Sequence, residues 1–284
     1  MKGVAIIAGG EGLLGRSLQS RLARFADLTV ISVGRSAGDL RDFASWEGLP
    51  RADYVFQLAA RTFVPESWET PYRFVQDNLE ITAAAVEYCR LHKAKIIYAS
   101  SYLYGNPETL PIAETARVDI SNPYGLSKRM CEEMVEHFSH MFGFPAAIVR
   151  PFNIYGPNQD ARFLLPSIVH QAKHSEAIQV QDLEPKRDYV FVEDVAEAFI
   201  ASALHDSPFA VFNVGSGESY SVGEVADIVK ALVGRDVPVV STGIRRVSEI
   251  MDTRADISKA NELLNWSPRV TIQEGLKLLV ESTA

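Results

Sequence analysis

The sequence predicts an α/β protein built on a doubly wound parallel sheet, with a smaller C-terminal lobe. Three observations predict this fold. Short runs rich in β-branched residues alternate with longer segments of helical period, which is typical of βαβ units around a buried parallel sheet. A glycine-rich loop lies between the first apolar run and the first helical segment. After residue 150 the alternation loosens and turn residues become denser.

The expected elements follow one another along the chain. Strands are expected at residues 4–8, 28–33, 54–58, 96–99 and 147–149. Helices are expected at residues 13–25, 71–91, 123–141 and 166–174. We expect residues 1–155, with a return segment near 187–215, to form the sheet domain. Residues 156–284 are expected to form mainly the smaller lobe.

Composition and charge limit the kinds of partner. The 284 residues are enough to bury a large core, and 47% of them are hydrophobic. A net charge of −8, without a basic cluster, argues against a nucleic acid as the main partner. The first apolar run is too short for a signal peptide, and no run is long enough to span a membrane, so a cytoplasmic protein without a membrane partner is expected. Cys89 and Cys131 lack metal-binding spacing, and His137 and His140 are expected on a solvated helix face, so no metal site is expected.

The loop at residues 9–15 reads GGEGLLG and joins the first strand to the first helix. Glycines in this position allow a tight turn and a close approach of the backbone to a pyrophosphate, while the helix N-terminus supplies N–H groups. The pattern predicts a dinucleotide site of the Rossmann type, and a glycine-rich turn without a ligand is the alternative. The expected cofactor contacts in this loop are Gly9, Gly12, Leu13, Leu14 and Gly15.

The second expected strand ends in Gly34-Arg35-Ser36 and not in a carboxylate. A carboxylate there would accept hydrogen bonds from the adenosine ribose of NAD and would repel a 2′-phosphate. Arg35 can pair with a 2′-phosphate, and Ser36 can donate a hydrogen bond to it. The sequence therefore predicts NADP as the cofactor, with NAD as the alternative.

A tyrosine and a lysine stand four residues apart at an expected helix start. Asn122 can cap this helix and Pro123 can take its first position. Tyr124 and Lys128 would then lie on one face, about 5–6 Å apart at Cβ. A nearby ammonium favours the phenolate, so we expect Lys128 to lower the pKa of Tyr124 from its usual value of about 10. Such pairs are common on solvated helix faces, so this interpretation depends on the motifs around the pair.

Taken together, these motifs resemble the extended short-chain dehydrogenase/reductase family, whose members epimerise, dehydrate or reduce nucleotide-activated sugars. The resemblance covers essentially the whole chain. It implies a catalytic triad of Ser100, Tyr124 and Lys128, in which the serine stands four residues before Tyr104 of the Tyr104-Gly105 motif. Further cofactor contacts that the resemblance implies are Asp39, Leu40, Leu58, Ala59, Ala60 and Asn78.

The resemblance also implies a substrate site and a homodimer. Its substrate-binding residues are Ser101, Tyr102, Asn153, Arg187 and Arg246, with Val247 in place of the proline usual after that last arginine. Two arginines opposite a glycine loop would give a cleft with two anion sites, one for the pyrophosphate of the dinucleotide and one for that of the substrate. In the family the helices expected at 71–91 and 123–141 pair across a two-fold axis, so a dimer through a four-helix bundle is expected.

The residues after Ser100 bear on the reaction. The family's 4,6-dehydratases carry an acidic pair where this chain has Ser101 and Tyr102, which disfavours dehydration. Arg35 favours net reduction, because a reductase more often takes NADPH. The prediction is an NADP-dependent reductase of a nucleotide-linked 4-keto-6-deoxy sugar, of the GDP-4-keto-6-deoxymannose reductase type used in deoxysugar biosynthesis, with hydride transfer to C4 and Tyr124 as proton donor. An NAD-dependent nucleotide-sugar 4-epimerase is the alternative, and a catalytically silent dinucleotide-binding protein is a third interpretation.

Overall fold

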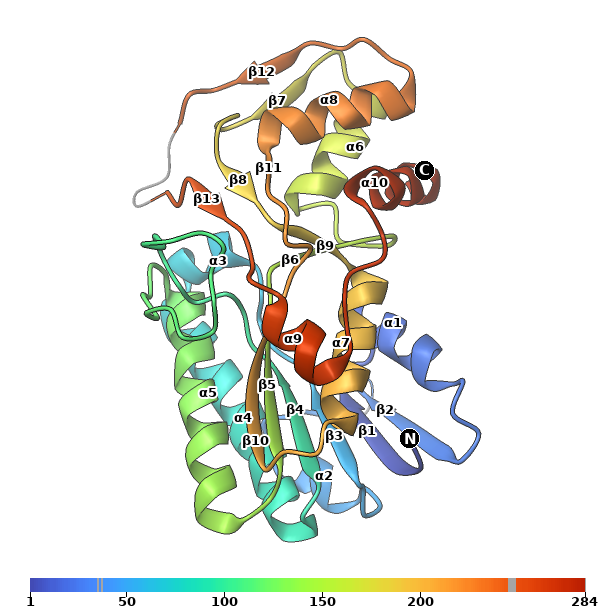
Figure 1. Ribbon diagram of the computed structural model, residues 1–284, viewed down its shortest axis with the longest axis vertical. Coiled ribbons are helices and arrows are strands. Elements are labelled where there is room, and N and C mark those ends of the chain that lie inside the picture. The colour runs from blue at the N-terminus through green and yellow to red at the C-terminus, as the bar shows by residue number, and fades with distance from the viewer. Residues whose placement is uncertain (35, 37, 245–248, 284) are drawn as a thin grey trace.

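The computed structural model describes residues 1–34, 36, 38–244 and 249–283. A parallel sheet with the strand order β10-β5-β4-β3-β1-β2 forms the lower half of the molecule in Figure 1. Its strands are β1 (Gly3–Ala8), β2 (Leu28–Val33), β3 (Tyr54–Gln57), β4 (Lys95–Ala99), β5 (Ala146–Pro151) and β10 (Phe209–Val214). The predicted strands are confirmed, and β10 adds an edge strand beside β5. The strand order reverses between β1 and β3, which is where open α/β sheets bind their ligands.

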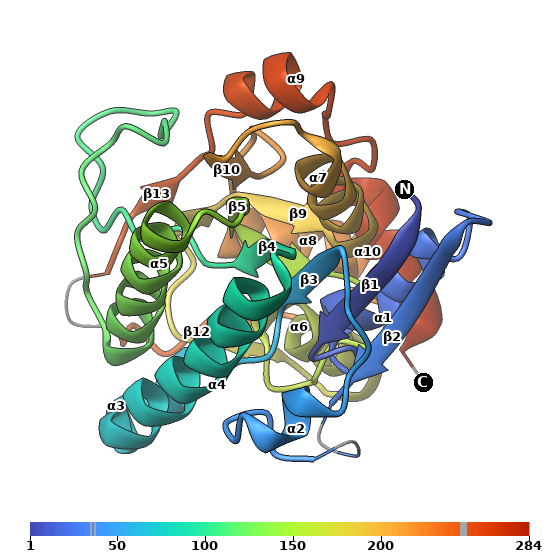
Figure 2. The ribbon, with the colours of Figure 1, turned by 90° about the horizontal axis from the view of Figure 1, so that it is seen from below.

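Helices cover both faces of this sheet, as the view in Figure 2 shows. One face carries α2 (Ala44–Glu47), α4 (Pro71–His92) and α5 (Pro123–Phe142). The other face carries α1 (Leu13–Leu22), α7 (Val192–Leu204) and α9 (Ser258–Leu264). Each face has its own apolar core, with Tyr88 and Val135 in the first and Phe56 and Phe199 in the second. The predicted doubly wound α/β fold is thereby confirmed.

The upper lobe in Figure 1 has a separate apolar core. Its helices are α6 (Leu164–His174), α8 (Val222–Val233) and α10 (Ile272–Ser282), which contact one another and contribute Ile168, Val225 and Leu276 to this core. Its short strands are β6 (Asn153–Tyr155), β7 (Ile178–Val180), β8 (Lys186–Arg187), β9 (Tyr189–Phe191), β11 (Tyr220–Ser221), β12 (Val239–Ser241) and β13 (Asp252–Thr253). We propose a boundary near residue 155, with residues 192–214 and α9 returning to the sheet.

Asp188 joins three segments at the base of the upper lobe. Its side chain is fully buried and accepts hydrogen bonds from the backbone N–H groups of Ser216, Gly217 and Ala255, at 2.6, 3.0 and 3.0 Å. Burial raises the pKa of this carboxyl, and the backbone donors act in the opposite direction. The aspartate between Arg187 and Tyr189 therefore fixes the strand end that carries Arg187.

Several element boundaries differ from the predicted ones. The first helix ends at Leu22 and not at residue 25, because the N–H of Phe25 bonds the carbonyl of Leu22 as the chain turns toward β2. A short helix, α3 (Val64–Glu69), precedes α4 and was not predicted. The helix expected from residue 166 begins at Leu164, so Pro166 lies in its first turn, where a missing N–H costs little.

Neither a membrane span nor a metal cluster is found in the described residues. No helix there is long and apolar enough to cross a bilayer. Nor do three or more His, Cys, Asp or Glu side chains in those ranges group closely enough to hold a metal ion. Cys89 and Cys131 are unoxidised and buried, and burial raises the pKa of the Cys89 thiol, so this thiol packs as a small apolar side chain.

Candidate active site

A cavity of about 2240 Å³ lies between the two lobes. Its walls come from the glycine loop, from the chain after β3 and β4, from the start of α5, and from α6 and the β7–β8 region of the upper lobe. The predicted site residues that line it are Gly9, Gly12, Leu13, Leu14, Gly15, Asp39, Leu40, Leu58, Ala59, Ala60, Ser100, Ser101, Tyr102, Tyr124, Lys128, Asn153 and Arg187. Arg35 and Arg246 lie outside the described residues.

The glycine loop has the shape that a pyrophosphate requires. Gly9 has φ +89°, and a Cβ there would lie 2.7 Å from the backbone nitrogen of Ala59. A Cβ on Gly15 would lie 2.4 Å from the carbonyl oxygen of Gly9, so the helix packs closely on the loop. Within the described chain, no side chain caps the start of α1, and its first two residues, Leu13 and Leu14, line the cavity. These residues fit the pyrophosphate of a nicotinamide dinucleotide.

Glu11, inside this loop, lies against the end of β2. The Ser36 hydroxyl donates a hydrogen bond to Glu11 Oε1. A Cβ built on Gly34 would lie 2.7 Å from the Glu11 carboxyl carbon, so the glycine leaves room for this side chain. Ser36 was predicted to donate to a cofactor phosphate, but its hydroxyl donates to a carboxylate. Glu11 is not among the predicted site residues.

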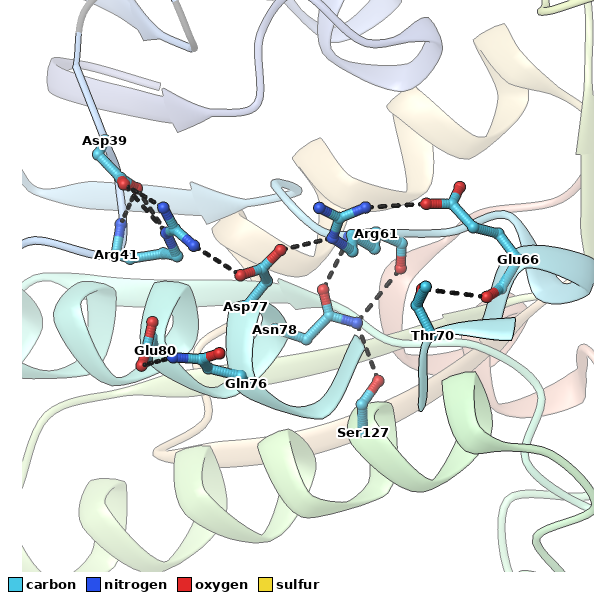
Figure 3. Close-up of polar contacts among 10 residues, drawn as sticks. All are labelled: Asp39, Arg41, Arg61, Glu66, Thr70, Gln76, Asp77, Asn78, Glu80 and Ser127. Atoms are coloured by element: carbon cyan, nitrogen blue, oxygen red, sulfur yellow. Dashed lines mark hydrogen bonds and ion pairs between the residues drawn. The ribbon is translucent and has the colours of Figure 1, made fainter. Parts of the chain in front are cut away.

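A row of ion pairs supports the cavity wall beside Asp39 (Figure 3). Arg41 pairs with Asp39 at 2.6 Å and with Asp77 at 2.7 Å, and Arg61 pairs with Asp77 and with Glu66, the latter at 2.9 Å. Burial alone would raise the pKa of Asp77. The two arginines together lower this pKa by more than burial raises it, so the net shift is downward. These ion pairs join the Asp39–Arg41 turn and the segment after β3 to α4. Sequence reasoning missed Arg41, Arg61 and Asp77, because nothing in their spacing shows that they meet.

Asn78 lies behind the cavity wall and not on it. Its side chain is buried, accepts from the Arg61 N–H at 2.7 Å, and donates to the Arg61 carbonyl and to Ser127 Oγ at 3.2 and 2.8 Å (Figure 3). These bonds use the amide oxygen and nitrogen to join α4, α5 and the segment after β3. The structure thus gives Asn78 a positioning role where a cofactor contact was predicted.

The start of α5 places Tyr124 and Lys128 as predicted. Asn122 Oδ1 accepts from the Gly125 N–H at 2.8 Å, and Pro123 takes the first helical position. Lys128 is buried, and its ammonium lies 4.6 Å from the centre of the Tyr98 ring. Both residues face the cavity.

The pKa of Tyr124 is raised and not lowered as predicted, because burial has the largest effect on it. Burial raises the pKa of the Tyr124 phenol to about 12, and it lowers the pKa of the Lys128 ammonium to about 8. Burial disfavours the charged form of each group, and this effect exceeds the attraction that helical spacing suggested. Tyr124 is therefore a phenol, and so a proton donor, throughout the neutral range.

The two serines after β4 differ in their surroundings. Ser100 is 4% exposed, and among the described residues its Oγ has no hydrogen-bond partner. Ser101 is partly exposed, and its side-chain hydrogen bond to Tyr124 opposes the rise of the phenol pKa. The structure therefore places Ser101 beside the phenol, although the resemblance implied Ser100 as the catalytic serine.

Replacing these serines separately will show which one acts with Tyr124. We expect Ser101→Ala to lower kcat by about 10²-fold, as loss of a hydrogen bond to a developing oxyanion does, and Ser100→Ala to lower it less. Steady-state kinetics on both variants, with circular dichroism as a check of folding, measures this. A larger loss of kcat in Ser100→Ala than in Ser101→Ala would show that Ser100 is the catalytic serine, as the resemblance implies.

The buried lysine predicts a pH dependence. Because the pKa of Lys128 is about 8, its ammonium is present below that pH and is lost as the pH rises through it. We expect kcat/KM, which reports groups of the free enzyme, to fall above about pH 8. A rate profile from pH 6 to 10 checks this, and a flat profile across that range would contradict it.

On the opposite wall, Arg187 is held by the upper lobe. Its Nη1 donates to the carbonyls of Ile250 and Lys186 at 2.6 and 2.8 Å, and its Nη2 pairs with Glu249. Glu249 also lines the cavity and was not predicted as a site residue, although it follows Arg246 by three positions. The arginine and the carboxylate together can bind a phosphate and a hydroxyl.

Tyr102 and Asn153 form the floor between the lobes. The Tyr102 hydroxyl donates to Asn153 Oδ1 at 3.2 Å, and its ring stacks on Phe152 with centroids 5.0 Å apart. Asn153 Nδ2 donates to the Asp188 carbonyl at 3.1 Å. Both predicted residues therefore lie in the cavity and link the segment after β4 to the strand end that carries Arg187.

Comparison with known proteins identifies the family. Residues 5–215 match the model of the "NAD dependent epimerase/dehydratase family". The chain therefore belongs to this family, and it is an NAD(P)-dependent enzyme of the extended short-chain dehydrogenase/reductase type.

Individual relatives carry out different reactions. The chain is 29% identical to GDP-6-deoxy-D-mannose reductase of Pseudomonas aeruginosa, over 96% of this chain and 95% of the reductase. It is 30% identical to a putative UDP-glucose 4-epimerase of Methanocaldococcus jannaschii, over 97% and 96% of the two chains. The solved structure of RMD from Pseudomonas aeruginosa complexed with NADPH superposes with a TM-score of 0.92 at 26% identity, over 99% and 98% of the two chains.

Proposed function

We propose that the protein transfers hydride at C4 of a nucleotide-linked sugar. The observation that carries this proposal is the meeting of Ser101, Tyr124 and Lys128 in a cavity whose opposite wall holds Arg187. A bound nicotinamide dinucleotide supplies or accepts the hydride. Tyr124 donates a proton to the oxygen that develops negative charge at C4, and Ser101 hydrogen-bonds the same oxygen. Lys128 adds positive charge beside them below about pH 8.

The upper-lobe wall supports a nucleotide-linked substrate. The Arg187 side chain is 15% exposed and faces the cavity, so its guanidinium can take a phosphate oxygen without leaving its backbone partners. Glu249 beside it can accept hydrogen bonds from sugar hydroxyls. We therefore place the substrate pyrophosphate at Arg187 and the reacting sugar toward Tyr124.

Net reduction of a nucleotide-linked 4-keto-6-deoxy sugar is the first candidate reaction. The similarity to GDP-6-deoxy-D-mannose reductase extends over nearly the whole of both chains, which supports it. Residues 100–105 contain neither Asp nor Glu, and elimination of water would need an acid and a base beyond the phenol. These observations favour reduction over dehydration.

A nucleotide-sugar 4-epimerase is the second candidate. The Glu11 carboxylate at the end of β2 favours it, because a carboxylate there suits NAD, the cofactor that an epimerase retains. The similarity to a putative UDP-glucose 4-epimerase over 97% of this chain also supports it. The two candidates differ in whether the hydride stays on the sugar or is exchanged between its two faces.

Incubation with nucleotide sugars separates the two reactions. We expect a reductase to consume one equivalent of reduced cofactor for each 4-keto sugar converted. An epimerase would instead interconvert UDP-, dTDP- or GDP-hexoses over many turnovers without added cofactor. Tyr124→Phe is the inactive control for both. Absence of conversion of every nucleotide sugar under both regimes would contradict the proposed function.

We also propose that two chains associate through α4 and α5. Leu126, Met130 and Met141 on α5 are 45, 38 and 60% exposed, and Tyr72 on α4 is 75% exposed. Large apolar side chains exposed along two neighbouring helices suit a four-helix interface with a second copy. Sedimentation at micromolar concentration tests it, and a monomer would contradict it. The cytoplasmic location stays a prediction.

A further inference from the structure

We propose that residues 156–163 form a strap that closes over the dinucleotide site and gates the entry and release of the cofactor. The strap joins β6 to α6 and belongs to the upper lobe, yet it contacts the sheet domain at two separate points. This inference deepens the proposed function and rests on its nicotinamide dinucleotide site. It applies to either candidate reaction, because a reductase exchanges its cofactor in every turnover and a 4-epimerase retains it.

The first contact attaches the strap to the helix that follows the glycine loop. Arg16 comes directly after Gly15, and its Nη2 donates to the backbone carbonyl of Asn158 at 3.2 Å. Its Nη1 donates to the carbonyl of Glu11 in the glycine loop. Asn158 has φ +63°, a left-handed conformation that asparagine tolerates, and both Arg16 and Asn158 line the cavity. The strap is therefore held against the loop at which we place the cofactor pyrophosphate.

The second contact packs the strap on the chain that follows β3. The rings of Phe63 and Phe163 meet edge to face, with their centroids 5.6 Å apart. The Arg162 guanidinium lies 4.7 Å from the centre of the Phe63 ring, and it also pairs with Asp160 at 2.9 Å. These four residues line the cavity, and Phe63 lies three positions after Ala60, a predicted cofactor contact. The upper lobe thus touches the sheet domain directly beside the dinucleotide site.

Hydrogen bonds inside the strap fold it into two consecutive turns. The N–H of Gln159 bonds the Gly156 carbonyl at 3.3 Å, and the N–H of Phe163 bonds the Asp160 carbonyl at 3.1 Å. A Cβ on Gly156 would lie 2.6 Å from Val192 Cγ1, so the strap starts in close contact with α7. The strap is therefore compact, and it separates from the sheet domain by breaking one of its two contacts or both.

The two contacts lie on opposite faces of the sheet. α1, which carries Arg16, covers one face, whereas the chain at Phe63 leads into α3 and α4 on the other face. The strap consequently crosses the carboxyl edge of the sheet at β1 and β3, where a dinucleotide binds. Because the strap also lines the cavity, we expect at least one contact to open before a dinucleotide passes.

Stopped-flow fluorescence on the whole protein measures this gating without any turnover. NADH and, separately, NADPH report association on mixing, and displacement by an excess of NAD or NADP reports dissociation. We expect Phe63→Leu and Phe163→Leu each to raise kon and koff together, by about threefold to tenfold, as the loss of aromatic and cation–π contacts allows. The Kd should change little, because opening is made easier with and without the cofactor.

A double variant and a matched control make the test specific. Phe63→Leu combined with Phe163→Leu should give the same rate constants as Phe63→Leu alone, because the two rings share one contact. Phe25→Leu removes another ring under a guanidinium, that of Arg24 at 5.0 Å, but Phe25 does not line the cavity. Its kon and koff should equal those of the wild type. Circular dichroism checks that each variant is folded.

The outcomes are distinct. Unchanged kon and koff in both Phe63→Leu and Phe163→Leu would overturn the inference. A rise in koff alone, with a weaker Kd, would also overturn it, since the rings would then contact the cofactor and not gate its passage. Failure of both NADH and NADPH to bind the wild type would contradict the proposed function as well. Gated binding without conversion of any nucleotide sugar would support the strap and contradict the proposed reaction alone.

Discussion

Tyr124→Phe is expected to lower kcat by about 10²- to 10⁴-fold, the range in which positioned general acids contribute. The phenol lies in the cavity beside Ser101, and its pKa of about 12 keeps it protonated across the neutral range. Removing the hydroxyl removes the proton donor and leaves the ring to fill its place. Cofactor affinity and the melting temperature should change little.

A matched substitution provides the control. Tyr54→Phe also removes one phenolic hydroxyl, but Tyr54 is partly exposed at the first position of β3 and does not line the cavity. Its kcat should equal that of the wild type on the same nucleotide-sugar substrate. Near-normal turnover by Tyr124→Phe would show that another group transfers the proton.

Glu132→Gln is expected to lower the free energy of unfolding by about 3–5 kcal/mol, the cost of breaking a buried ion pair. The side chains of Glu132 and Arg150 are 1% and 6% exposed, and they form two hydrogen bonds, Nε to Oε1 at 2.8 Å and Nη2 to Oε2 at 2.7 Å. Arg150 also donates to the Tyr104 hydroxyl at 2.9 Å. The variant leaves this guanidinium buried without its counter-ion.

The neighbouring residue on α5 gives the control. Glu133 pairs with Arg129 at 2.9 Å, but its side chain is 60% exposed. Glu133→Gln should therefore cost less than about 1 kcal/mol. Urea unfolding of both variants at one pH measures the difference, and equal small losses would show that the buried pair contributes little.

The double variant Glu132→Met with Arg150→Met isolates the cost of the unpaired charge. Two apolar side chains of similar volume remove both charges together, so this variant should recover much of the stability that Glu132→Gln loses.

The Glu132 carboxylate also raises the pKa of Lys128, against the lowering by burial. Loss of this carboxylate should therefore move the descending limb of the pH profile to lower pH.

The parts of the fold that the sequence predicts are those with local signals. The buried strands are short apolar runs, and the start of α5 is marked by Asn122 and Pro123 within three residues of Tyr124. The glycine loop is recognisable in the sequence because only glycine fits at positions such as Gly9 and Gly15. A Cβ at either position would clash with backbone atoms. Each of these signals acts over a few residues, so one sequence suffices to find it.

The missed features depend on contacts between distant segments or on burial. Ser36 lies 25 positions from Glu11, and Arg187 lies 62 positions from Glu249, so their pairing follows from the packing of strands and loops. Burial also reverses the expected pKa of Tyr124, because helical spacing reveals a neighbour but not the solvent that both groups lose. Ser100 and Ser101 are adjacent in sequence, and only the direction of the chain after β4 separates their roles.

Transfer of an isotope from cofactor to sugar tests the central claim most directly. A nucleotide-linked 4-keto-6-deoxy sugar is incubated with a reduced nicotinamide dinucleotide that carries deuterium at C4 of its nicotinamide ring. Nuclear magnetic resonance then locates the label in the product. Hydride transfer with Tyr124 as proton donor predicts deuterium at sugar C4, and its absence from the product in Tyr124→Phe. Deuterium at another carbon, or a reduced sugar without deuterium, would contradict the proposed reaction.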